Sequence, residues 1–106
     1  MNYETAKSLI QERVAKSTDN IGIYDLYSMI FCDDLNAVLN MIDQLEMATS
    51  EERTSWEYGY LLGQAIGNLD TSESILIYFG KTMGENGKAL LSAFEAINAR
   101  LVALHP

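Results

Sequence analysis

The sequence has few residues that form cross-links, break helices or commonly act in catalysis. Among 106 residues it contains one cysteine, Cys32, one histidine, His105, and one proline, which is the last residue. A single cysteine excludes an intrachain disulfide, and its place in the apolar run YSMIFC favours a small buried side chain. Without internal proline, and with Leu, Ala, Glu, Met and Ile throughout, the composition favours helices.

Long apolar runs are also absent. No stretch approaches the roughly 20 apolar residues that a membrane span needs. The opening residues, MNYETAKSLIQERV, have charges spread through them and do not resemble a signal peptide. We therefore expect a cytoplasmic protein with no membrane partner.

The usual catalytic and ligand sets are missing as well. One cysteine and one histidine supply no metal-ligand cluster, and the lone histidine removes the general base of most hydrolase mechanisms. Residues 82–89, TMGENGKA, match the phosphate-binding loop only at Gly87 and Lys88. We predict no metal, no cofactor and no enzymatic activity, with acid–base catalysis by carboxylates alone as the open alternative.

Positive charge is missing from a long interval. The net charge is −8, and no Lys or Arg occurs between Lys16 and Arg53. That interval contains eight acids: Asp19, Asp25, Asp33, Asp34, Asp43, Glu46, Glu51 and Glu52. Such a field repels nucleic acid and attracts basic partners. The alternative is a solvated acidic surface that only keeps a small protein soluble.

What is present is a series of amphipathic segments, which predict an all-α fold. We expect a single compact bundle-like domain, residues 1–106, of five to six short helices. The predicted helices cover residues 2–17, 21–32, 49–68, 74–84 and 87–104, and a further helix begins at Asp33 or Asp34. The helix over 49–68 starts with the capping box TSEE. Residues 74–79 also have the composition of a strand, but no second strand is predicted to pair with them.

A row of glycines interrupts one predicted helix. In WEYGYLLGQAIG, residues 56–67, the glycines are four residues apart, although each interior glycine weakens a helix by about 1 kcal/mol relative to alanine. One interpretation is close packing against another helix of the domain. The other is a shallow groove, flanked by aromatic rings, that accepts a partner's side chain or helix. The residues of this helix-packing or groove set are Trp56, Gly59, Tyr60, Gly63 and Gly67.

These patterns favour a non-catalytic binding protein. The leading hypothesis is an acidic protein that neutralises a basic, nucleic-acid-acting protein by occluding its active surface, a profile typical of immunity proteins against nuclease-type toxins. The predicted partner contacts are Asp19, Tyr24, Asp25, Tyr27, Asp33, Asp34, Asp43 and Glu46.

Two alternatives share part of this profile. One is a phage- or plasmid-encoded inhibitor of a host defence or nucleic-acid enzyme that acts as a nucleic-acid mimic. The other is a homodimeric structural or adaptor module, whose self-interface would be the apolar segment 21–32 or the glycine groove. None of the three binds nucleic acid directly, and the chain is expected to be a monomer or a homodimer.

Overall fold

The protein is all-α, as predicted. In a computed structural model, which describes residues 1–16 and 23–104, the elements are α1 (Tyr3–Ala15), α2 (Ile23–Met47), α3 (Trp56–Phe79) and α4 (Glu85–Leu104). Two short 3-10 helices, η1 (Glu52–Thr54) and η2 (Gly80–Met83), lie before and after α3. The described residues include no strand, so residues 74–79 are helical.

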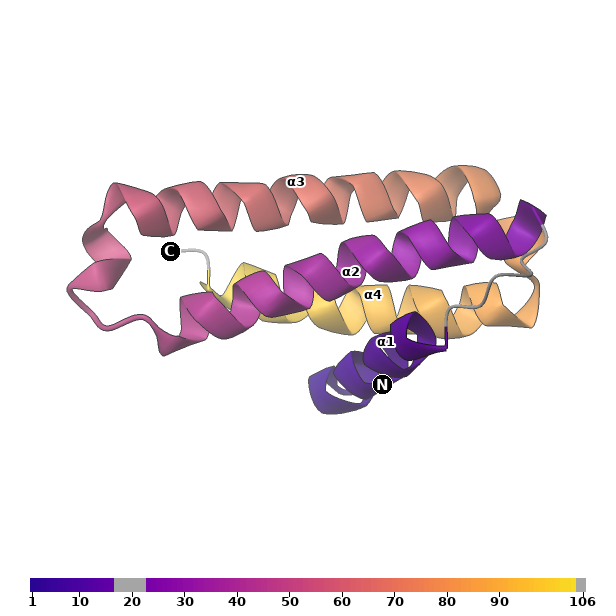
Figure 1. Cartoon of the computed structure of the whole chain (residues 1–106), viewed down its shortest axis with the longest axis horizontal. Coiled ribbons are helices and arrows are strands. Elements are labelled where there is room, and N and C mark those ends of the chain that lie inside the picture. The colour runs from indigo at the N-terminus through magenta and orange to yellow at the C-terminus, as the bar shows by residue number, and fades with distance from the viewer. Residues whose placement is uncertain (17–22, 105–106) are drawn as a thin grey trace.

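Three long helices set the shape of the molecule. Figure 1 shows α2, α3 and α4 along the longest axis, with each antiparallel to the next and α1 packed against α2 and α4 at an angle. The molecule measures 46 × 24 × 22 Å, so it is an elongated bundle. In this arrangement α3 contacts α2 along one side, and its opposite side forms an outer edge of the bundle.

The prediction of five to six short helices was wrong, because two predicted breaks do not occur. Asp33 and Asp34 were expected to cap a new helix, but α2 continues through both of them. The Gly67–Asn68 pair was expected to end a helix, but α3 continues to Phe79. In each case the buried stripe continues across the predicted break, and burial of that stripe outweighs a locally weak helix former.

Helix ends are fixed by the expected kinds of group, though not always at the expected residues. Asn2 caps α1, as predicted, by accepting a hydrogen bond from the Thr5 amide at 2.8 Å. The capping box also forms: the Glu52 amide donates to Thr49 Oγ1 at 3.2 Å and the Thr49 amide donates to Glu52 Oε1 at 3.1 Å. The box begins η1, and Ser55 caps α3.

The break before the last helix lies at Gly84, whereas it was predicted at residues 85 and 86. Gly84 has φ +61°, a left-handed conformation that glycine adopts without strain. Glu85 and Asn86, which lie between two predicted helices, belong to the first turn of α4. The core between the helices is continuous and is built from α1, α2, α3 and α4; its largest fully buried side chains include Phe31, Ile10, Leu35, Leu39, Ile42 and Leu90.

Candidate functional site

The predicted contact residues on α2 are divided between surface and interior. Asp19 lies outside the described residues, as do the side chains of Tyr24 and Asp25. Asp33 is exposed, and its neighbour Asp34 is half-buried. Burial, and then the charge of Asp33, raises the pKa of the Asp34 carboxyl above its ordinary value.

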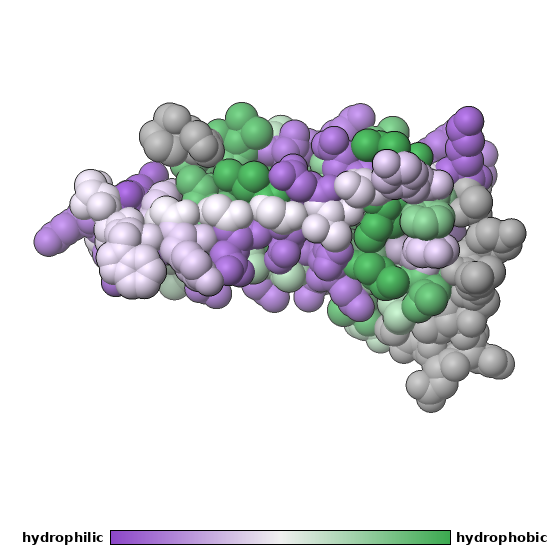
Figure 2. All heavy atoms as spheres, turned by 90° about the horizontal axis from the view of Figure 1, so that it is seen from above, coloured by the Kyte–Doolittle hydropathy of each residue, from purple (hydrophilic) through white to green (hydrophobic). Residues whose placement is uncertain are grey.

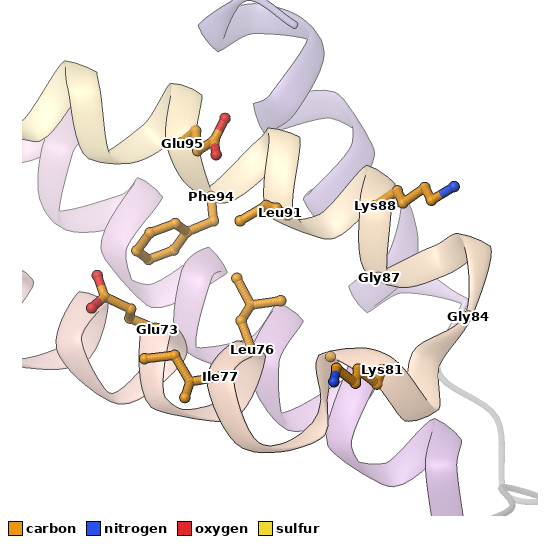
Figure 3. A pocket seen from close by; sticks show the side chains of 11 residues that line it. Glu73, Leu76, Ile77, Lys81, Gly84, Gly87, Lys88, Leu91, Phe94 and Glu95 are labelled. Atoms are coloured by element: carbon orange, nitrogen blue, oxygen red, sulfur yellow. The ribbon is translucent and has the colours of Figure 1, made fainter.

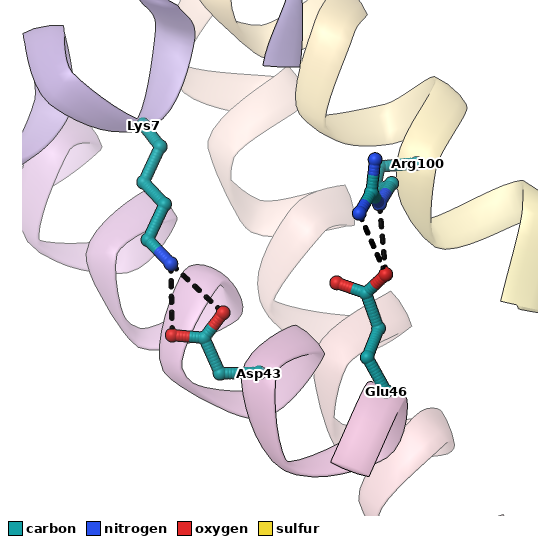
Figure 4. A network of polar contacts seen from close by, with 4 residues as sticks. All are labelled: Lys7, Asp43, Glu46 and Arg100. Carbon is teal, nitrogen blue, oxygen red and sulfur yellow. Dashed lines mark hydrogen bonds and ion pairs between the residues drawn. The ribbon is translucent and has the colours of Figure 1, made fainter. Parts of the chain in front are cut away.

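Two of the predicted contacts form ion pairs within the bundle. Lys7 Nζ of α1 lies 2.9 and 3.0 Å from the two carboxylate oxygens of Asp43, and Arg100 Nη2 of α4 lies 2.8 Å from Glu46 Oε2 (Figure 4). The Arg100 guanidinium also lies 4.6 Å above the centre of the Tyr3 ring. Asp43 and Glu46 therefore attach α1 and α4 to the C-terminal half of α2.

Tyr27 faces the bundle. Its ring stacks on that of Phe79, with centroids 3.7 Å apart and an angle of 10° between the planes. It packs against the hydrophobic core and is half-buried. One face of the ring is thus occupied by α3. Among the predicted acidic contacts whose side chains are described, only Asp33 and Asp34 form no ion pair within the described chain.

A different surface brings exposed aromatic rings together with glycines. Along the outer side of α3, residues follow one another at intervals of four, three, four, seven and four. We call this row the outer seam: Trp56, Tyr60, Gly63, Gly67, Ser74 and Tyr78. Trp56, Tyr60 and Tyr78 are 74%, 62% and 77% exposed.

The glycines of this helix do not pack against another helix of the described chain. A Cβ atom added at Gly59, Gly63 or Gly67 would meet no neighbouring element within 4 Å. The interpretation of close packing against another helix was wrong because α3 lies at the edge of the bundle (Figure 1). The groove interpretation remains, because the space over the glycines is open and exposed aromatic rings precede and follow them along α3.

Two rings of the outer seam contact neighbouring side chains on α3. The Trp56 and Tyr60 rings meet edge to face, with centroids 6.2 Å apart. Gln64 Nε2 donates a hydrogen bond to the Tyr60 hydroxyl at 2.8 Å. Rings that are already oriented lose little conformational entropy when a partner covers them.

Every charged side chain of α3 is acidic. No Lys or Arg occurs between Arg53 and Lys81, and this second base-free interval contains the exposed acids Glu57, Asp70 and Glu73. Figure 2, which looks down on α3, shows a pale strip of intermediate hydropathy along the molecule, bordered by hydrophilic side chains and by hydrophobic patches. The interval is visible in the sequence. Its three acids give a weaker signal than the eight acids between Lys16 and Arg53.

The described residues contain neither a metal-ligand cluster nor an exposed thiol. They contain no group of three or more His, Cys, Asp or Glu side chains placed to hold a metal ion. Cys32 is buried, and this burial raises the pKa of its thiol to about 11. Within the same residues no helix combines the length and apolar character of a membrane span.

Comparison with known proteins adds no relative. No family model, curated protein or solved structure matches the chain.

Proposed function

We propose that this is a non-catalytic, acidic binding protein that covers the surface of a basic partner protein and so neutralises it. The observation that carries the proposal is the outer seam, where exposed Trp56, Tyr60 and Tyr78 surround an open row of glycines in an interval without a base. The proposed partner-binding surface therefore lies on α3, whereas the sequence alone placed it on the segment that forms α2.

The size of the outer seam suits a protein partner. From Trp56 to Tyr78 it extends for about 33 Å at 1.5 Å per residue. Its three rings expose roughly 400–500 Å² together, since each aromatic side chain has about 150–250 Å² to bury. That is about half of the roughly 800 Å² that each partner contributes to a standard interface.

The mechanism would be occlusion helped by charge. The rings would fill pockets on the partner, and the backbone of the partner would approach α3 closely over Gly63 and Gly67. Glu57 and Asp70 would lie against basic groups that the partner uses for phosphates. Immunity against a nuclease-type toxin is the specific role we propose, and inhibition of a host nucleic-acid enzyme would use the same contacts.

The symmetry of the outer seam favours a second candidate, a homodimer. Large rings lie at both ends of the seam and Gly67 lies midway between them. A second copy packed antiparallel across Gly67 would bring Trp56 of one chain near Tyr78 of the other. The three- and four-residue spacing is that of helices that pack in coiled coils.

Capture from the native cell extract tests the proposal. The tagged protein is incubated with the extract, bound proteins are eluted in rising salt, and the eluted proteins are identified. One stoichiometric basic partner released by salt is expected, and its identity separates an immunity protein from an inhibitor. Recovery of the chain alone, with a dimeric mass in solution, would overturn the proposal in favour of the homodimer.

A further inference from the structure

A second surface is a groove between α3 and α4. It has a volume of about 580 Å³ and lies between the C-terminal half of α3 and the N-terminal half of α4 (Figure 3). Its apolar lining comes from Leu76 and Ile77 of α3 and from Leu91 and Phe94 of α4. Ile77 and Leu91 are 68% and 45% exposed, so the described chain leaves much of this apolar surface to solvent.

The charges of the groove are sorted by sign along its length. Because α3 and α4 are antiparallel, Glu73 and Glu95 line one end, and Lys81 and Lys88 line the other from opposite walls, with the Lys88 side chain directed outward (Figure 3). The rise of 1.5 Å per residue separates the two ends by about 10–12 Å, or two helical turns. The apolar residues lie between these ends.

The charges at both ends are available to a ligand. Within the described chain, Glu73, Glu95 and Lys81 take part in no ion pair. Lys88 Nζ lies 3.5 Å from a Glu85 carboxylate oxygen, but both side chains are more than 80% exposed, so solvent screens the pair. The groove therefore complements a molecule with a cation, an apolar middle and an anion in that order.

We propose that this groove binds an amphipathic helix of a partner protein. Such a helix would present an acidic side chain to Lys81 and Lys88, apolar side chains to Ile77 and Leu91, and a basic side chain to Glu73 and Glu95. An acid near the N-terminus and a base near the C-terminus both suit the helix dipole. The bound helix thus runs parallel to α4 and antiparallel to α3, as a third helix over the groove.

The proposal concerns a different surface from the outer seam and stands without it. The residues that line the groove include none of the six that define the outer seam. Replacement of Trp56 by alanine should therefore leave binding in the groove unchanged.

The test uses two designed peptides of about 15 residues, each fixed as a helix by a side-chain staple. The matched peptide has a glutamate, two leucines in the next turn, and a lysine two turns after the glutamate. The exchanged peptide differs only in that the glutamate and lysine change places. Fluorescence anisotropy with the full chain should show the matched peptide bound about tenfold more tightly.

A charge-reversed protein provides the control. All four charged side chains of the groove are exposed, so a variant with Glu73→Lys, Glu95→Lys, Lys81→Glu and Lys88→Glu should fold, which circular dichroism checks. This variant should prefer the exchanged peptide by a similar factor. If the variant does not fold, Ile77→Arg takes its place and should abolish binding of the matched peptide.

Three results would overturn the proposal. The first is equal binding of the two peptides, or no binding of either. The second is binding of a zwitterionic alkyl detergent monomer but of neither peptide, which would assign the groove to small amphiphiles. The third is self-association of the protein that the charge reversal abolishes, which would assign the groove to a second copy.

Discussion

The inner and outer sides of α3 share one spacing and differ in what they contact. On the inner side Leu62, Ala65, Leu69 and Ser72, which we call the inner seam, follow one another at intervals of three and four and are buried. On the outer side, the outer seam has the same spacing and faces solvent. Packing within the described chain accounts for the inner seam only.

The two seams also differ in the residues they contain. The inner seam has leucines and an alanine, and its one polar member, Ser72, donates a hydrogen bond to the Asn68 carbonyl at 3.1 Å. The outer seam has rings at its ends and glycines between them. The comparison indicates that the inner seam stabilises the fold and that the outer seam is available for binding.

The largest difference should appear in stability. Leu69→Ala removes a side chain that is 5% exposed, so we expect the free energy of unfolding to fall by about 2–5 kcal/mol. Tyr78→Ala removes a ring that is 77% exposed and should lower it by no more than about 0.5 kcal/mol. Urea unfolding of both variants measures the difference. Equal losses would show that the outer seam is part of the core.

The opposite ranking should appear in binding. Trp56→Ala and Tyr60→Ala should each weaken binding of the captured partner by about 2 kcal/mol, or roughly 30-fold, because aromatic anchors dominate interfaces. Val102→Ala is the matched control, since Val102 is 61% exposed on α4 and is not a residue of the outer seam. Calorimetry measures all three. If the α4 variant loses as much affinity as the α3 variants, the outer seam is not the binding face.

Alkaline pH should act on the buried side of the molecule. Cys32 belongs to the same core as the inner seam, and burial raises its pKa from 9.0 to about 11. Because the raised pKa favours the neutral thiol in the folded state, its contribution is full below pH 9 and is lost as pH rises to about 11. Cys32→Ala should flatten stability over that range in pH-dependent thermal unfolding. An unchanged slope would contradict the assignment.

Glycine replacement should separate stability from binding. Gly63→Ala adds a Cβ that meets no neighbour within 4 Å, so the helix should gain up to about 1 kcal/mol. The added methyl group should hold a partner away from α3 and weaken the complex. Thermal unfolding and calorimetry on one variant test both effects. A more stable variant with unchanged affinity would show that the partner does not approach the glycines.

The smallest effect should come from an ion pair that joins α1 to α2 and includes no residue of either seam. A double-mutant cycle on Lys7 and Asp43 should give a coupling of about 0.2–1 kcal/mol, because both side chains are partly exposed. Affinity for the partner should not change in either single variant. A loss of affinity in Asp43→Asn would return part of the interface to α2, as the sequence first indicated.

Helical structure could be read from the sequence, but its division into helices could not. Asp33 and Gly67 are residue types that often begin or end helices, yet both lie on exposed sides of helices that continue. Their local preference is worth about 1 kcal/mol or less, and burial of the residues around them outweighs it.

Part of the proposed binding surface was singled out from the sequence. Trp56, Gly59, Tyr60, Gly63 and Gly67 were predicted to lie on one face, and all five are exposed. Periodicity alone could not tell whether another helix covers that face, because the two seams of α3 have the same period. The partners of Asp43 and Glu46 lie 36 and 54 residues away, so their ion pairs depend on tertiary packing.

The central claim is that the outer seam of α3 contacts the partner, and capture with matched variants tests it most directly. The wild type, Tyr60→Ala with Tyr78→Ala, and Val102→Ala are each tagged and incubated with the same native extract, and the salt-eluted proteins are quantified. We predict one basic protein in stoichiometric amount with the wild type and with Val102→Ala, and little of it with the double variant. Equal recovery of that protein by all three would contradict the claim.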